Sequence, residues 1–210
     1  TASYDLAISA YLAKQLPEDD LALLEPLNPL GDLVFIEAED FEASIDEGGG
    51  LPERIDLGLA KVADLRYGEN PHQRAALYDI GDGGGIANAE QLHGKEMSFN
   101  NFVDAQAAWE LVNDLDERAV AIIKHTNPSG VGVGNTNEEA YRRALATDPV
   151  SAFGGIVAFN RTVDATAAAS VNEVFTEVVV APDFDAEALD IFRSKKNLRV
   201  LKAASSGANG

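Results

Sequence analysis

A lysine and a histidine stand side by side at Lys124 and His125, directly after the apolar run 119–123. A short, wholly apolar run is typical of a strand buried on both faces, and open α/β sheets bind ligands beyond the carboxyl ends of their strands. An ammonium group and an imidazole there supply a positive charge and a group that titrates near neutral pH. The competing interpretation is that the chain simply leaves the sheet through polar residues, and position alone leaves both open.

A second concentration of reactive side chains lies in segment 65–73, whose sequence is LRYGENPHQ. Arg66 offers a planar fork for a phosphate or carboxylate, and Tyr67 offers a stacking face. The alternative is a structural turn, in which Asn70 hydrogen-bonds its own backbone and Pro71 fixes the exit. The mixture of side chains favours a binding loop.

Two other polar segments precede regular elements. Residues 98–101 (SFNN) lie just before a helical pattern, where Ser or Asn acts as an N-cap and one asparagine is left to bind something else. Residues 148–155 (DPVSAFGG) lead into a strand, and their glycines permit the close approach of a ligand or merely a tight turn. Neither segment is specific by itself.

Several familiar kinds of site are excluded. The chain has no cysteine, which rules out disulfides, thiolate nucleophiles and cysteine-ligated zinc. His72, His93 and His125 lack metal-ligand spacing, so we expect no metal site. Segment 130–134 (GVGVG) follows a strand, but its third glycine is misplaced for a dinucleotide-binding loop. Neither a phosphate-binding P-loop nor a nucleophile-elbow serine motif occurs.

The chain is strongly acidic, with 35 Asp and Glu against 16 Lys and Arg and a formal net charge of -19. Such a surface repels nucleic acid and anionic membranes, so we expect neither as a partner. The acidity fits either a disordered acidic tail or the dispersed surface of a halophilic protein, and the spread of the carboxylates favours the second. The lack of cysteine, of a signal-peptide pattern and of an apolar run of about 18 residues fits a cytoplasmic setting.

Hydrophobic periodicity predicts an α/β fold. Strands that alternate with helices imply a mainly parallel sheet, because parallel neighbours need crossover connections. The elements expected from the sequence are, in order, helix 4–14, a short strand at 33–36, helix 102–115, strand 119–123, a glycine-rich loop, helix 137–147, strand 156–159, helix 164–175, strand 178–181, helix 185–194 and strand 198–201.

Six segments, taken in order, resemble the transformylase portion of bifunctional purine-biosynthesis proteins, which join AICAR transformylase to IMP cyclohydrolase. They are LRYGENPHQ, HGKEMSFNNFVDA, KHTNPSG, DPVSAFGGIVAFN, EVVVAPDF and KKNLRVL, and the resemblance runs from about Ile55 to Leu201. It implies the first of two lobes of cytidine-deaminase-like α/β topology over residues 55–202. Residues 1–54 would be a linker-like helix and acidic segment, and 203–210 a flexible end. The cyclohydrolase region is not expected in these residues.

The resemblance also implies a reaction, the transfer of a formyl group from 10-formyltetrahydrofolate to the 5-amino group of AICAR. By resemblance, His125 would accept the amine proton and Lys124 would stabilise the oxyanion on the formyl group. Acyl transfer needs both a base and a positive group where charge develops. The remaining assignments are Arg66 and Tyr67 on the AICAR nucleotide, Asn101 nearby, Phe153 and Gly154 on the substrate or folate pocket, and Glu177 on the pterin.

Departures from the family pattern leave alternatives. Ser129 stands where related chains often have cysteine, and a hydroxyl serves there if the position is structural. The family draws further contacts from a second lobe and from the partner subunit of a homodimer, so this chain alone is expected to lack part of the site. A nucleotide-binding lobe without turnover is therefore one alternative, and an unrelated dinucleotide-binding enzyme is another.

Overall fold

The computed structural model describes residues 59–79 and 84–204. The chain forms two compact units, Thr1–Asp82 and Gly83–Gly210, and each is described by itself. The expected helix 4–14, the expected strand 33–36 and the expected boundary at residue 55 lie outside the described residues.

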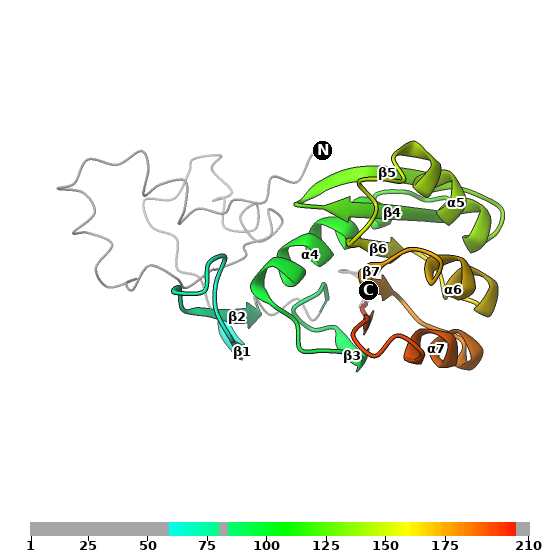
Figure 1. Cartoon of the computed structure of the whole chain (residues 1–210). Helices are drawn as coiled ribbons and strands as arrows, with labels where there is room; N and C mark the ends of the chain where they lie inside the picture. Colours follow the sequence, from blue (N-terminus) through cyan, green and yellow to red (C-terminus); the bar gives the residue numbers. More distant parts are fainter. Residues whose placement is uncertain (1–58, 80–83, 205–210) are drawn as a thin grey trace, which may run out of the picture. The chain divides into compact units, whose positions relative to one another are not determined.

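In the first unit the described residues form a β-hairpin (Figure 1). Strand β1 (Ala60–Leu65) pairs antiparallel with β2 (Ala75–Asp79), and segment 66–74 connects them. Ala75, Ala76 and Leu77 are buried, while most of β1 is exposed. The hairpin therefore presents segment 66–74, the binding loop that the sequence predicts, at its tip.

The second unit contains a six-stranded sheet in the order β3-β8-β7-β6-β4-β5. After residue 98 most helices and strands form close to where the sequence predicts them, but two strands follow one another without an intervening helix. The elements are β3 (Glu90–His93), α4 (Phe99–Asn113), β4 (Ala119–Lys124), β5 (Asn127–Val133), α5 (Asn137–Thr147), β6 (Gly155–Phe159), α6 (Ala165–Val171), β7 (Thr176–Ala181), α7 (Ala186–Arg193) and β8 (Arg199–Lys202).

The sheet is mixed, whereas the sequence predicted a mainly parallel one. Strand β6 runs parallel to β7, and β7 to β8, but the pairs β3–β8, β4–β5 and β4–β6 are antiparallel. The difference arises in segment 130–134, which was expected to be a loop and instead lies largely in strand β5. Because β4 and β5 are joined through His125 and Thr126 alone, they form a hairpin, and a hairpin is antiparallel by construction.

The glycines of β5 are explained by packing against α5. A Cβ atom on Gly130 would lie 2.0 Å from the carbonyl oxygen of Ala144, and one on Gly132 would lie 2.2 Å from that of Ala140. Alternate glycines therefore let the backbone of α5 approach the strand closely. This packing explains the alternating glycines of segment 130–134 without a role in dinucleotide binding.

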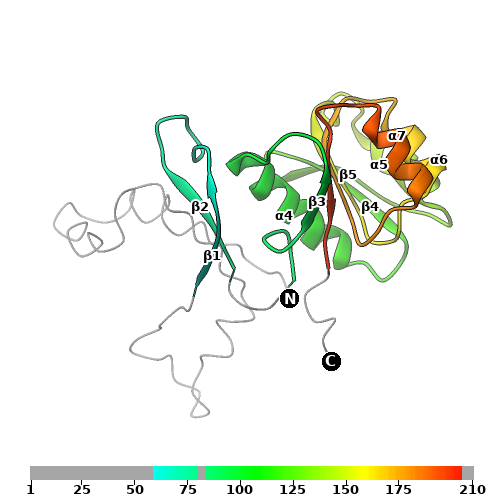
Figure 2. The same cartoon turned by 90° about the horizontal axis from the view of Figure 1, so that it is seen from below.

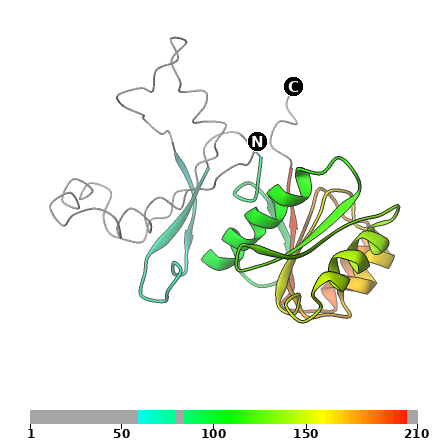
Figure 3. The ribbon, with the colours of Figure 1, turned by 90° about the horizontal axis from the view of Figure 1, so that it is seen from above.

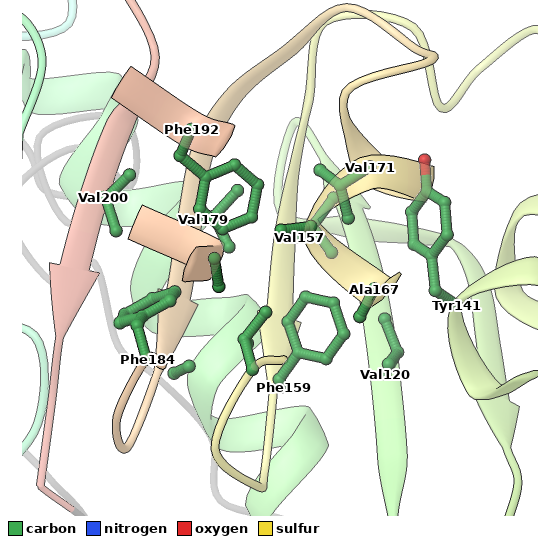
Figure 4. Packing of buried hydrophobic residues seen from close by; sticks show 14 of the residues in the cluster. Val120, Tyr141, Val157, Phe159, Ala167, Val171, Val179, Phe184, Phe192 and Val200 are labelled. Carbon is green, nitrogen blue, oxygen red and sulfur yellow. The ribbon is translucent and has the colours of Figure 1, made fainter. Parts of the chain in front are cut away.

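Helices cover both faces of the sheet. Helix α4 lies on one face, and α5, α6 and α7 lie on the other (Figures 2 and 3). Along β4 the side chains alternate. Val120 packs toward α5, α6 and α7 (Figure 4), as does Ile122, whereas Ala121 and Ile123 pack toward α4. Both faces of β4 are thus buried, as its wholly apolar sequence predicts.

The end of the lobe is also tied to the sheet. The buried Ala203 donates its N–H to the carbonyl of Ala181 at 3.1 Å, and Ala204 accepts from the N–H of Gly85 at 3.1 Å.

Among the described residues, no helix is long and apolar enough to cross a membrane.

Asn160 links three parts of the second unit from a buried position. Its Oδ1 accepts from the Ala119 N–H at 2.8 Å, and its Nδ2 lies within hydrogen-bonding distance of the carbonyls of Val112, Leu115 and Glu117. Replacing Asn160 with Leu should lower the free energy of unfolding by about 2–4 kcal/mol, because buried backbone groups lose their partners. Urea denaturation measures the loss. The same change at the exposed Asn100 should stay within about 0.5 kcal/mol, and an equal loss at both positions would contradict the interpretation.

Candidate active site

One end of the six-stranded sheet gathers most of the expected site residues. Strand β4 ends at Lys124, and because β4 is antiparallel to β6, the N-terminal ends of β6 and β7 lie beside it. Phe153 and Gly154 immediately precede β6, and Glu177 is in the first part of β7. The candidate site therefore combines the carboxyl end of one strand with the amino ends of two others. The tendency of ligands to bind beyond the carboxyl ends of strands predicted only the part of the site at the end of β4.

Lys124 and His125 differ in how they are held. The half-buried Lys124 donates from Nζ to the carbonyl oxygen of Phe153 at 2.8 Å, which fixes the ammonium group between β4 and the segment before β6. His125 is exposed, and together with Thr126 it forms the two-residue turn between β4 and β5. Both turn residues have left-handed backbones, with φ of 52° and 60°. A cation and an imidazole are thereby placed next to each other at the surface.

An aromatic pair lies beside the ammonium group. Phe153 and Phe175 are 59% and 51% exposed, unusually high values for phenylalanine, and their ring centroids are 5.2 Å apart. Gly154 adopts a φ of 75° and donates its N–H to the Phe175 carbonyl at 2.7 Å, which holds the two segments together. Exposed aromatic faces next to a cation suit a flat, polar ligand.

Sequence reasoning missed Phe175, because it placed the residue in helix 164–175. Helix α6 instead ends at Val171, where Asn172 forms the C-cap and donates its side-chain amide to the Ile191 carbonyl at 2.9 Å. The chain then turns, and Phe175 emerges directly before β7. The asparagine was the signal that could have shortened the predicted helix.

Asp148 shapes the segment that carries Phe153. Its carboxylate accepts from the Val150 N–H at 3.1 Å and from the Ser151 N–H and hydroxyl at 2.9 Å and 2.6 Å. These bonds, the one from the Ser151 hydroxyl foremost, lower the pKa of Asp148 below its ordinary value. A lowered pKa in the folded state means that the ionised form stabilises the fold. That contribution is complete above the ordinary aspartate pKa and is lost as the pH falls through the lowered one.

Replacing Asp148 with Asn should therefore lower the urea midpoint of unfolding at pH 7. The difference from the unchanged chain should shrink below about pH 3, where the wild-type carboxylate also becomes protonated. Urea titrations across this range measure both effects. A difference that is the same at both pH values would show that ionisation of Asp148 does not hold this turn.

Asn101 and Glu177 are joined to each other. The buried Asn101 completes the capping box of α4 by accepting from the N–H and hydroxyl of Ser98, and its Nδ2 donates to Glu177 Oε2 at 3.0 Å. Arg199 approaches the same carboxylate oxygen at 3.8 Å. The sequence suggested that one asparagine takes no part in capping, but Asn101 does take part. It is the cap partner and also connects α4 to β7.

A β-bulge aims Glu177 toward α4. Gly155 pairs with Thr176 and Ile156 pairs with Val178, so that Glu177 is an extra residue on β7. Such a bulge redirects a side chain that regular alternation would send to the other face. A similar shift leaves Ser129 as the extra residue of β5, where its hydroxyl donates to the Ile122 carbonyl at 3.2 Å. The hydroxyl thus has a structural partner.

In the first unit, Arg66 and Tyr67 lie together at the hairpin tip. The Arg66 guanidinium sits over the Tyr67 ring at 5.6 Å from the centroid. The loop is shaped by Gln73, whose side chain accepts from the Asn70 N–H at 2.7 Å and whose carbonyl accepts from the Gly68 N–H at 3.0 Å. Asn70 and Gln73 thus build the turn, which leaves Arg66 exposed.

A cavity of about 430 Å³ adjoins this loop. It is lined by several cationic or basic side chains, although the protein as a whole is acidic. They are Lys61, Arg66, His72 and Arg74; the acidic Asp64 also lines the cavity and forms an ion pair with Lys61. Such a lining suits a phosphate or carboxylate. Within residues 59–79 and 84–204 no group of His, Asp and Glu is arranged to hold a metal ion.

The structure thus describes an α/β protein whose candidate site lies at one end of a mixed sheet. A family model described as the AICARFT/IMPCHase bienzyme matches residues 1–209. The bifunctional purine biosynthesis protein PurH of Desulfitobacterium hafniense is 47% identical over 208 residues, which cover 99% of this chain and 36% of that protein. Those of Halalkalibacterium halodurans and Persephonella marina are 45% and 54% identical, over 90% and 72% of this chain and 38% and 30% of theirs. The chain belongs to the AICARFT/IMPCHase bienzyme family, and it spans 30–38% of the length of these relatives.

Proposed function

We propose that this chain is part of an AICAR formyltransferase, which transfers a formyl group from 10-formyltetrahydrofolate to AICAR in purine biosynthesis. The observation that carries the proposal is the adjacency of Lys124 and His125 at the sheet end, next to exposed aromatic rings. Membership of the AICARFT/IMPCHase family supports the choice of substrates.

The proposed reaction is an acyl transfer. The 5-amino nitrogen of AICAR attacks the formyl carbon, which forms a carbon–nitrogen bond and places negative charge on the formyl oxygen. The Lys124 ammonium stabilises that charge, and the His125 imidazole accepts the proton lost by the amine. When the bond from the formyl carbon to N10 of the folate breaks, N10 takes up a proton and leaves as tetrahydrofolate.

The remaining side chains are proposed to bind the two substrates. Arg66 and Tyr67 hold the AICAR nucleotide, since the basic cavity beside them suits its phosphate. Phe153 and Gly154 line the pocket for the flat rings. Asn101 lies near the substrate and holds Glu177, which accepts hydrogen bonds from the pterin.

A second candidate function is a nucleotide-binding lobe without turnover of its own. The observation that favours it is length, because the chain covers only 36% of the Desulfitobacterium protein. A second lobe and a partner subunit in a homodimer would then complete the site, as the family resemblance implies.

Formyl transfer to AICAR separates the two candidates. The assay is run in molar KCl with 10-formyltetrahydrofolate, first with this chain alone and then with the remaining length of a relative added. Turnover only after addition would support a shared active site, and turnover by the chain alone would show that this lobe suffices. No formyl-AICAR in either assay, from folded protein, would overturn the proposed function.

A further inference from the structure

We propose that Asp104 is a positioning residue, whose carboxylate holds the backbone of the His125–Thr126 turn and thereby fixes where Lys124 and His125 point. This inference rests on the proposed function for its effect on turnover. Its structural basis is independent of that function. Asp104 lies on α4, in the second turn of the helix, and reaches across to the end of β4.

The turn that Asp104 touches is unfavourable for its own sequence. A two-residue hairpin turn with a left-handed backbone at both positions, the type I′ turn, usually contains Asn, Asp or Gly there. Here His125 and Thr126 take these positions, with φ of 52° and 60°. A β-branched residue such as Thr rarely adopts this conformation, so other contacts must stabilise it.

Asp104 provides those contacts from outside the hairpin. Its Oδ1 accepts from the Thr126 N–H at 2.8 Å, and its Oδ2 accepts from the His125 N–H at 3.3 Å. A carboxylate that accepts from two successive backbone N–H groups favours the turn that makes both point the same way. Helix α4 is a rigid support for it, because the neighbouring Ala105 is fully buried and the helix start is capped by Ser98.

The other side of His125 is fixed as well. Its carbonyl oxygen accepts from the Thr126 hydroxyl and from the Asn127 side-chain amide, both at 2.7 Å. Among the described residues, the structure shows no hydrogen bond to the imidazole itself. The backbone of His125 is thus held at both ends while its ring remains exposed. Asp104 therefore acts on the position of the imidazole and not directly on its proton.

Replacing Asp104 with Ala tests this role in the protein completed with the remaining length of a relative. We expect kcat for formyl transfer to fall about 10- to 100-fold, because misplacement of a catalytic group by about 1 Å has an effect of that size. The KM for AICAR should change much less. Asp104→Asn should behave similarly, since its amide nitrogen would face a backbone N–H and only one oxygen could accept.

A second substitution separates positioning from a general loss of structure. Glycine adopts a φ near 60° without a steric penalty, so Thr126→Gly should restore kcat about tenfold or more in the Asp104→Ala background. Thr126→Ala is the matched control, because it removes the same hydroxyl but keeps Cβ, and it should not restore activity. If Asp104→Ala keeps its full kcat, or if the glycine variant rescues no better than the alanine variant, the proposal is wrong.

Amide hydrogen exchange of the 210-residue chain tests the same contact without any turnover. The His125 and Thr126 amides should be protected, and Asp104→Ala should accelerate their exchange about tenfold or more. The Val120 and Val157 amides in the core should keep their protection, which shows that the fold is intact. Protected amides, together with no formyl-AICAR from either the chain alone or the completed protein, would overturn the proposed function but not the positioning role. Unprotected amides in the wild type would overturn the positioning role itself.

Discussion

Replacing Lys124 with Gln is expected to reduce kcat for formyl transfer about 100- to 1000-fold, in the protein completed with the remaining length of a relative. The ammonium group is the only cation that the structure places at the carboxyl end of β4, among the described residues of that strand and its turn. Removing one donor that stabilises a developing oxyanion has an effect of this size. Replacing His125 with Ala should reduce kcat about 100- to 10,000-fold, the range for a general base.

Stability distinguishes a catalytic role from a structural one. The Lys124 side chain makes one hydrogen bond in the structure, to the Phe153 carbonyl. Loss of this bond should lower the free energy of unfolding by no more than about 1–2 kcal/mol. His125 is exposed, and its replacement should alter stability still less. Lys196→Gln and His93→Ala are the matched controls, because they remove the same side chains elsewhere and should leave kcat unchanged. Full turnover in the Lys124 and His125 variants, or unfolding of either, would contradict the catalytic assignment.

Replacing Gly132 with Ala is expected to produce the largest loss of stability, about 3 kcal/mol or more. The new Cβ would lie 2.2 Å from the Ala140 carbonyl oxygen and 2.6 Å from the Ala144 nitrogen. Both are backbone atoms of a packed helix, so α5 as a whole would have to move away from β5. Overpacking in a tightly packed region has this order of effect, and backbone clashes lie at its upper end.

Urea denaturation of the 210-residue chain measures this loss directly. Val131→Ala is the matched control, since Val131 immediately precedes Gly132 in β5 but is 37% exposed. Its replacement should change the free energy of unfolding by less than about 1 kcal/mol. If Gly132→Ala is no more harmful than Val131→Ala, close packing is not the reason for the glycine repeat.

Elements with strong local signals were predictable from the sequence. The apolar run 119–123 is strand β4, and the helix expected at 137–147 forms with these limits. Thr136 caps that helix by accepting from the Glu139 N–H, and acidic residues occupy its first turn, both of which are local start signals. Such features depend on neighbours in sequence alone.

The direction and extent of the strands were harder to predict. Strand β5 contains Asn, Pro and two glycines, which are usually rare in strands. It forms a strand nonetheless because its glycines pack closely against α5. The turn at His125 and Thr126 lacks the Asn or Gly that normally reveals a tight hairpin. The sequence therefore suggested a loop and a mainly parallel sheet where the structure has a hairpin.

The candidate site shows the same division. Lys124 and His125 were singled out from their position after an apolar run, and the family resemblance supplied their expected roles. Asp104 and Arg199 were not singled out from the sequence. Their roles depend on contacts with residues far away in sequence, namely Thr126 and Glu177. No local pattern reports such contacts.

A crystal structure of this chain, completed with the remaining length of a relative and with AICAR bound, tests the central claim most directly. We expect the 5-amino group of AICAR to lie within about 3.2 Å of the His125 imidazole, or one water molecule away. We also expect the imidazole ring of AICAR to lie beside Phe153. The Lys124 ammonium should lie where the formyl oxygen would be. AICAR bound away from the end of β4, with His125 facing solvent, would contradict the proposed roles of Lys124 and His125.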